Sequence, residues 1–335
     1  MLSRVADSLY WMSRYIERAE NTSRLLDVNL QLMLDFEGLD DEAMTGHWLP
    51  IVSGSGDLDR FNELHGVADS RSVTEFLTFN PENPNSIIAC INNARESARM
   101  VRDQISSEMW EVINNTYHKL RKLDADSIWD KGPCEFYEDI KRDSLLFQGL
   151  TESTFTHNQG YKFMQAGRLL ERADQTSRII DIKYHMLLPG PAGIGGTVDL
   201  AQWMAVLRGC SAFEAYHHRY VNEVQPWNVA EFLILCENFP RSIRFCVATL
   251  DYHLRSITLT GEGQFSNPAE QLSGRMRSEL IYTSIEEIIQ EGLHEYIDRL
   301  QQRLIHLNNA ILECYVFQPE IDLSREIEQQ QQQQQ

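Results

Sequence analysis

A segment rich in arginine and glutamate occurs twice in this 335-residue chain, and it limits the possible folds more than any other feature of the sequence. Residues 14–28 read RYIERAENTSRLLDV, and residues 168–182 read RLLERADQTSRIIDI, 154 positions later. The first Arg, the Glu-Arg-Ala triplet, the Thr-Ser-Arg triplet and the Asp are identical in the two copies. Apolar residues recur in both copies at spacings of three and four, which is the period of an amphipathic helix. The chain is therefore expected to contain two equivalent long helices.

The similarity extends beyond these two helices at a nearly constant offset. Trp203 follows Trp48 by 155 positions, and residues 229–233 (VAEFL) follow residues 73–77 (VTEFL) by 156. Such agreement predicts an internal duplication, with two multi-helix halves related by a pseudo-two-fold axis. We place the first helical repeat at 1–158 and the second at 159–320, and we expect the polar, Gln-rich residues 321–335 to be disordered.

The predicted fold class is all-α, because no stretch longer than four residues shows the strict alternation of a half-buried strand. We expect helices over 5–35, 86–123, 134–156, 160–188, 269–292 and 292–317. The Pro- and Gly-rich residues 189–196 are expected to form a loop.

Composition narrows the possible partners. The formal charge is −19 and the isoelectric point about 4.9, which disfavours sequence-independent binding to nucleic acid or to anionic lipid. The sequence contains no apolar run long enough to cross a membrane and no secretory signal, so we expect a cytoplasmic protein. Its six cysteines form no C-x-x-C pair and are expected to be small, free core residues.

The charged positions of the repeated segment are the candidate site. They are Arg14, Glu17, Arg18, Arg24, Arg168, Glu171, Arg172 and Arg178. Three interpretations remain open. The side chains could form ion pairs buried between the two halves, or an arginine-rich surface that binds a carboxylate, a phosphate or a partner protein. They could also form a solvated ladder, with Arg14 paired to Glu17 and Glu20 paired to Arg24, which contributes little free energy.

Other chemistry has weaker support in the sequence. Asp181 and His185 are four residues apart on a helix, but no third metal ligand is evident, so we predict no metal site. The cluster of Ser and Thr before His157 is better explained by helix capping than by a nucleophile. The sequence offers no nucleotide-binding motif. We predict no cofactor, and the sequence leaves any catalytic residue unknown.

At the Glu-Arg positions the chain resembles a known family. Residues 15–24 (YIERAENTSR), 167–176 (GRLLERADQT) and 1–11 (MLSRVADSLYW) are similar to the bacterial alpha-E family, and the resemblance spans about residues 1–315. It implies an all-helical domain with a Glu-Arg motif. It also implies a genomic context in which the neighbour is a circularly permuted ATP-grasp protein and, in some cases, a transglutaminase-like protein. The implied process is the formation or modification of peptide or amide bonds.

Three hypotheses about function follow. The first is a non-catalytic helical partner subunit that docks on an ATP-grasp ligase or holds its substrate. The second is a ligase or transferase component that binds an anionic acyl or phosphate group through the arginines, with Glu17 or Glu171 as base. The third is a structural homo-oligomer.

Overall fold

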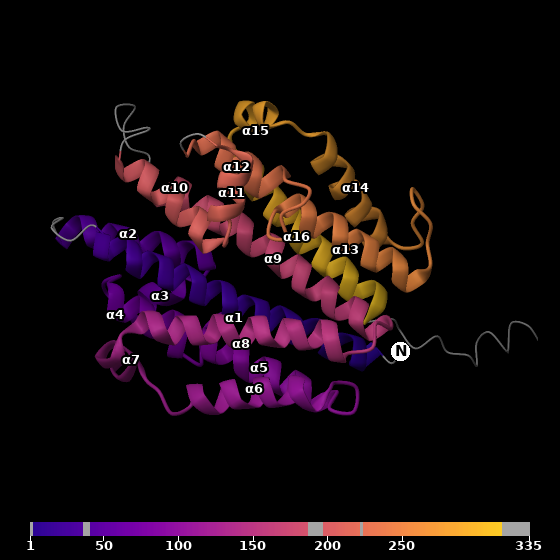
Figure 1. The fold of residues 1–335 in the computed structure, drawn as a ribbon, viewed down its shortest axis with the longest axis horizontal. Coiled ribbons are helices and arrows are strands. Elements are labelled where there is room, and N and C mark those ends of the chain that lie inside the picture. Colours follow the sequence, from indigo (N-terminus) through magenta and orange to yellow (C-terminus); the bar gives the residue numbers. More distant parts are fainter. Residues whose placement is uncertain (1–2, 36–40, 187–196, 222–223, 317–335) are drawn as a thin grey trace, which may run out of the picture.

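The computed structural model describes residues 3–35, 41–186, 197–221 and 224–316, and these residues form helices joined by turns, with no strand among them (Figure 1). The all-α prediction is confirmed for this part of the chain. The helices up to residue 154 are α1 (Ser3–Asp35), α2 (Asp41–Ser55), α3 (Leu58–Leu64), α4 (Ser70–Thr74), the π-helix η1 (Glu75–Phe79), α5 (Ile87–Met100), α6 (Ser107–Leu120), α7 (Ala125–Lys131) and α8 (Pro133–Thr154). Those that follow are α9 (Gln159–Met186), α10 (Thr197–Gly209), α11 (Phe213–Arg219), α12 (Pro226–Leu235), α13 (Ile243–Thr258), α14 (Pro268–Tyr282), α15 (Ile285–Glu291) and α16 (Leu293–Tyr315).

Helices α1 and α9 form the centre of the molecule, and they carry the two copies of the repeated segment (Figure 1). The two helices run in the same general direction, since Tyr10 lies beside Gly167 and Glu17 lies beside Arg172. They approach closely at Gly167, where a Cβ atom would lie 2.3 Å from the backbone oxygen of Tyr10. Glycine is required here because any side chain would push the two backbones apart.

Each central helix has its own covering layer. Helices α5 and α8 pack against α1, with α6 outside them, whereas α13 and α16 pack against α9, with α14 outside (Figure 1). The second helix of each half crosses over: α2 packs mainly on α9, and α10 packs mainly on α1. Both central helices are thereby covered on nearly every side, which places their charged positions in the protein interior.

Two predicted helices are each divided in the structure. The helix expected over 86–123 is interrupted between α5 and α6 by a turn in which the backbone N–H of Gln104 donates to Val101. Ser106 then starts α6 by accepting a hydrogen bond from the N–H of Met109. The helix expected over 269–292 is divided in the same way between α14 and α15, where Ser284 and Glu287 form a capping box. In both places a capping serine starts a new helix inside a stretch whose apolar periodicity predicts one continuous helix.

Some predictions lie outside the described residues: the disordered tail at 321–335 and the loop at 189–196. None of the described helices combines the length and the apolar character that crossing a membrane requires.

Candidate functional site

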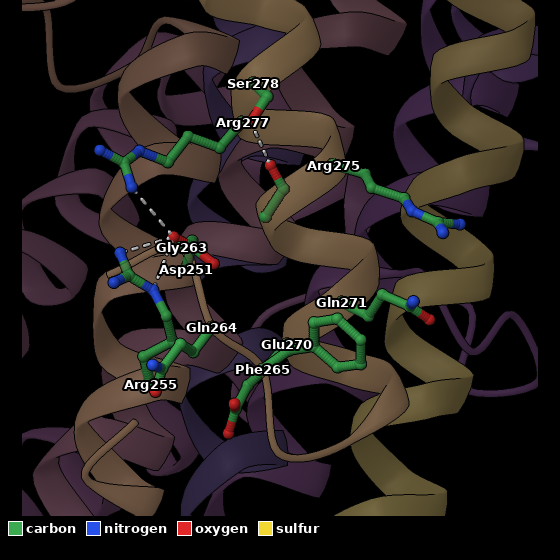
Figure 2. A pocket seen from close by; sticks show the side chains of 11 residues that line it. Asp251, Arg255, Gly263, Gln264, Phe265, Glu270, Gln271, Arg275, Arg277 and Ser278 are labelled. Carbon is green, nitrogen blue, oxygen red and sulfur yellow. Dashed lines mark hydrogen bonds and ion pairs between the residues drawn. The ribbon is translucent and has the colours of Figure 1, made fainter. Parts of the chain in front are cut away.

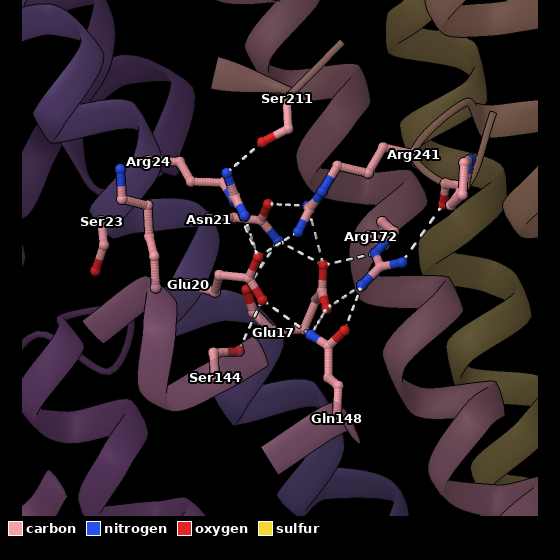
Figure 3. A network of polar contacts seen from close by, with 12 residues as sticks. Glu17, Glu20, Asn21, Ser23, Arg24, Ser144, Gln148, Arg172, Ser211 and Arg241 are labelled. Carbon is pink, nitrogen blue, oxygen red and sulfur yellow. Dashed lines mark hydrogen bonds and ion pairs between the residues drawn. The ribbon is translucent and has the colours of Figure 1, made fainter. Parts of the chain in front are cut away.

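The repeated Glu-Arg segments meet at the interface of α1 and α9, and Figure 3 shows the polar network on one side of it. The side chain of Glu17 on α1 points to α9, where Arg172 donates to both of its carboxylate oxygens at 2.8 and 2.9 Å. Arg241, from the turn before α13, donates to the same carboxylate at 3.2 Å. Asn21 and Gln148 add hydrogen bonds of 3.2 and 3.1 Å. Glu17 is completely buried and fully hydrogen-bonded.

Glu171 on α9 makes the reciprocal contacts. Arg18 of α1 donates to both of its oxygens at 2.7 and 3.0 Å, and Arg14 donates at 2.8 Å. Gln175, one turn along α9, adds a hydrogen bond of 3.1 Å. Glu171 is also completely buried. Each glutamate of the motif therefore pairs with the arginine that follows the other glutamate, across the interface between the two central helices.

A third buried carboxylate extends the network on the Glu17 side (Figure 3). Glu20 accepts from Arg24 at 2.9 Å and also pairs with Arg241. Ser144 of α8 donates to Glu20 at 2.7 Å, and Arg24 donates to Ser211 in the turn after α10. The network thus joins elements that are distant in the sequence: α1, α8, α9, the turn after α10 and the turn before α13.

The remaining two predicted arginines lie at the edges of the interface. Arg178 pairs with Asp174 at 2.8 Å and donates to the backbone oxygen of Gly54 at 3.1 Å. Arg168, although it is the counterpart of Arg14, does not contact a motif glutamate. Among the described residues its nearest acid is Glu152, at 4.0 Å, and its buried Nε has no hydrogen-bond partner there. Burial and the neighbouring Arg172 lower the pKa of Arg168.

Burial and charge act in opposite directions on the two glutamates. Desolvation alone would raise the pKa of Glu17, but Arg172 and Arg241 outweigh it and lower that pKa from 4.5 to about 2. For Glu171 desolvation is likewise outweighed, by Arg18 and Arg14, and its pKa is lowered. A carboxylate with so low a pKa and with every lone pair engaged is a poor general base. The geometry is that of a cross-link between helices.

The ladder pairing fits the structure only in part. Glu20 and Arg24 do pair, but buried rather than solvated, and Arg14 bonds to Glu171 on the other helix instead of Glu17. Two members of the network around Glu17, Arg241 and Gln148, were not among the residues predicted from the sequence. Arg241 stands where the first half has Asn85, so the repeat carried no signal for it.

Two cavities deserve comparison with this interface. A pocket of about 80 Å³ beside the Glu171 pair is lined by Arg18, Arg178 and Asn85 among others, and these side chains are already engaged with one another or with acids. A larger open pocket of about 380 Å³ lies between α13, α14 and the loop that joins them (Figure 2). One of its two acids, Asp251, is paired with Arg255 at 2.8 Å and with Arg277 at 3.5 Å. The other, Glu270, accepts from the backbone N–H of Ser266 at 2.8 Å. Neither pocket presents a free nucleophile next to a base.

Within the described residues, no group of three or more His, Cys, Asp or Glu side chains could hold a metal ion. Asp181 contacts His294 of α16 at 2.6 Å, and the side chain of His185 lies outside the described residues. His157 stacks on Tyr161 rather than facing a nucleophile, and Ser153 and Thr154 donate to backbone oxygens of their own helix.

Both Glu-Arg segments lie within a stretch of the chain that matches a known protein family. Residues 1–316 match the model of Alpha-E, which is described as a predicted alpha-helical domain with a conserved ER motif. The chain belongs to the Alpha-E family. The Glu-Arg pairs at 17–18 and 171–172 are the two places in this Alpha-E protein where the reciprocal ion pairs form.

Longer relatives contain a similar region. Uncharacterized proteins of Mycobacterium bovis and Mycobacterium tuberculosis are 24% identical to this Alpha-E chain over 318 residues, which covers 89% of the chain and 34% of each relative. The chain thus spans about a third of the length of these curated relatives. No solved structure matches the chain.

Proposed function

We propose that this Alpha-E protein is a non-catalytic partner subunit of an ATP-grasp-type ligase that forms or modifies peptide or amide bonds. It would dock on the ligase or hold its substrate, while the ligase activates the substrate with ATP. The observation that carries the non-catalytic part is the complete burial and pairing of Glu17 and Glu171. The most distinctive residues of the domain are occupied in joining α1 to α9, which leaves its outer helices for a partner.

The association with a ligase rests on the family resemblance and on the length of the relatives. In the mycobacterial proteins the similar region is about a third of a longer chain. A helical domain that works beside a catalytic domain can be a separate subunit in one organism and part of a fused chain in another. Fusion also raises the effective concentration of two modules that must meet.

We also infer that the two halves arose by duplication. The support is a set of local contacts that recur at the expected offset. Ser86 and Ser242 start α5 and α13 by accepting a hydrogen bond from the N–H three residues on. The thiols of Cys90 and Cys246 donate to the backbone oxygens of Pro84 and Pro240 at 3.7 and 3.5 Å. The reciprocal pairs of the motif fit the same pseudo-two-fold relation.

The test uses the purified chain and an ATP-grasp protein encoded beside an Alpha-E gene, the genomic neighbour that the family resemblance implies. We expect the two to co-elute in gel filtration at micromolar concentrations, and we expect this protein to increase ADP release when substrate is present. Absence of a complex together with unchanged turnover would refute the proposal.

A matched pair of variants separates this proposal from a catalytic role. Glu17→Gln combined with Glu171→Gln should lower the melting temperature but still support the ligase at a temperature where the variant remains folded. Loss of all turnover in a variant that is still folded would instead favour the hypothesis of an anion-binding transferase. Glu152→Gln, near the interface but half exposed, is the control.

The hypothesis of a structural homo-oligomer makes a different prediction. Light scattering on the isolated protein would give a closed oligomer of defined size that persists on dilution. A monomer that gains mass only when the ligase is added supports the partner-subunit proposal.

A further inference from the structure

The surroundings of Arg241 show how one guanidinium group fits beside the Glu-Arg motif (Figure 3). Arg241 donates to Glu17 at 3.2 Å and to Asn21 at 2.8 Å, and it also pairs with Glu20. Its side chain is almost completely buried, so the guanidinium fills the space between α1 and the turn before α13. This side of the motif therefore includes an arginine from outside the two repeated segments.

The first half contains the same turn without the arginine. Ser86 and Ser242 cap α5 and α13 in the same way, and the N–H of each serine donates to the backbone oxygen three residues earlier, at 3.1 and 2.9 Å. The residue before the serine is Asn85 in the first half and Arg241 in the second. Because asparagine is much shorter than arginine, it cannot fill the equivalent space.

The pocket of about 80 Å³ beside the Glu171 pair lies at that equivalent place. It is lined by Asn85 and by residues of α1, α2 and α9, among them Asp174 and Gln175. Asp174 and Gln175 each follow an acceptor of Arg241 by 154 positions. A single water needs roughly 10–15 Å³ of such space, so the pocket has room for several waters or for one guanidinium group.

Two oxygen atoms of the lining accept no hydrogen bond from the described residues. The amide of Gln175 donates to Glu171 through Nε2 at 3.1 Å, and because a carboxylate only accepts, Oε1 is the atom left free. Asp174 accepts from Arg178 through Oδ2, which leaves its Oδ1 without a donor. Both oxygens keep accessible surface, unlike the unpartnered buried atoms elsewhere in the described chain. The pocket therefore offers open acceptors at the positions where Arg241 finds its own.

The charges around the pocket also differ from those around Arg241. Asn85 takes the place of that positive residue. Asp57 stands 155 positions before Ala212, so an acid occurs where the second half has none. The half-buried carboxylate of Asp57 accepts from the amide of Asn85 at 3.0 Å and pairs with no cation among the described residues. With one base fewer and one acid more than the other side, this side of the motif favours a bound cation.

We propose that this pocket binds a small molecule that carries a guanidinium group on an alkyl chain. The N–H groups of the ligand donate to Oε1 of Gln175 and to Oδ1 of Asp174. A guanidinium has a planar fork of donors, which suits two separate acceptors better than the compact charge of an ammonium. The alkyl chain contacts the apolar part of the lining, which includes Leu25 and Ile179. This role is independent of the proposed ligase partnership, because it needs only the folded chain.

Two arginines of the lining do not make the pocket an anion site. Arg18 and Arg178 are each already bonded to an acid. In the second half, burial and the counterparts of these two arginines lower the pKa of Arg241, and Glu20 and Glu17 oppose that effect. A further guanidinium is thus accommodated there because it meets acceptors. An anion in the pocket would instead face the two free oxygens, which repel it.

Ethylguanidinium is the probe, and saturation-transfer NMR on the full chain is the measurement. A molecule of about six heavy atoms should bind with a millimolar dissociation constant. Ethylurea keeps the planar shape but has no charge, and ethylammonium keeps the charge but lacks the fork. Each should bind about tenfold more weakly than ethylguanidinium, because hydrogen bonds from a charged fork are stronger. Propionate has the opposite charge and should give no saturable signal.

Two variants test the residues. Asn85→Arg supplies the guanidinium from the chain itself and should fold, since the same turn carries Arg241 in the second half. Asp174→Asn keeps the shape of the side chain but removes the charge. Each should weaken ethylguanidinium binding by at least about tenfold. Asn92→Arg, at an exposed position of α5, makes the same change in charge away from the pocket and should leave binding unchanged.

Three results would overturn the proposal. The first is no saturable ethylguanidinium signal, which would mean that ordered water alone fills the pocket. The second is equal or tighter binding of ethylurea, ethylammonium or propionate. The third is binding that Asn85→Arg weakens no more than Asn92→Arg does, which would mean that the ligand responds only to the net charge of the protein. None of these results would affect the co-elution test of the ligase partnership.

Discussion

Replacing Glu171 with Gln is the sharpest test of the idea that the Glu-Arg motif joins the two halves. The change keeps the shape of the side chain but removes the negative charge that Arg14 and Arg18 share. Both arginines would then remain largely buried without an acid, and their contacts with Asn308 and Asn85 cannot replace the charge. Breaking a buried pair in this way costs about 3–5 kcal/mol, a large part of a typical folding free energy.

Urea unfolding followed by circular dichroism at pH 7 measures the loss. Glu96→Gln is the control, since Glu96 also contacts two arginines, Arg95 and Arg99, but its side chain is 48% exposed. That change should cost less than about 1 kcal/mol. Combining Arg14→Met and Arg18→Met with Glu171→Leu should recover part of the loss, because no charge is left unpaired. A cost for Glu171→Gln no larger than that of the control would refute the reasoning and reopen the motif as a binding site.

Three further predictions concern acid sensitivity and helix packing. Glu17 has a pKa of about 2 in the folded protein against an ordinary 4.5, so the stability it contributes is complete above pH 4.5 and is lost as the pH falls toward 2. This amounts to about 3 kcal/mol, and melting temperatures across that range should fall less steeply in Glu17→Gln. Burial and Arg168 lower the pKa of His253 from 6.5 to about 4. The stability that neutral His253 contributes is therefore complete above pH 6.5 and is lost as the pH falls from 6.5 to 4. His253→Phe should make the melting temperature less dependent on pH over that range. Gly167→Ala should destabilise by more than about 2 kcal/mol because of its contact with the Tyr10 backbone, whereas Gly149→Ala, with open space around it, should stabilise α8 by about 0.5–1 kcal/mol. Equal melting temperatures for these two glycine variants would contradict the close helix approach.

The sequence predicted the central helices well because their signals are local. The apolar spacing of α1 and α9 and the repeated Glu-Arg segment are both readable without any tertiary information. The divided helices were harder to predict, since the serines at 106 and 284 act as caps only in their actual backbone conformation. A serine inside an apolar periodic stretch is equally compatible with a continuous helix.

The pairing of the motif could not be derived from the sequence alone. Spacing within a helix made Arg14 and Glu17 appear to be partners, whereas the actual partner of Arg14 is 157 positions away. Such a choice depends on how α1 and α9 are rotated about their axes, which is fixed by packing around them. Arg241 is a comparable case: it belongs to no recognisable motif, and its importance depends on what surrounds it in the folded protein.

The reciprocal pairing has a consequence for how the chain is made. Helix α1 leaves the ribosome before α9, with two glutamates that will be buried, but one of the arginines that will neutralise them is Arg172. At about 5–20 residues per second, roughly 8–30 s pass before α9 has been synthesised. During that interval Glu17 has neither of its arginine partners, Arg172 and Arg241, so its carboxylate can remain ionised only in contact with water. We expect the nascent first half to stay open along α1 until the second half arrives, and to be open to chaperones or proteases while it waits.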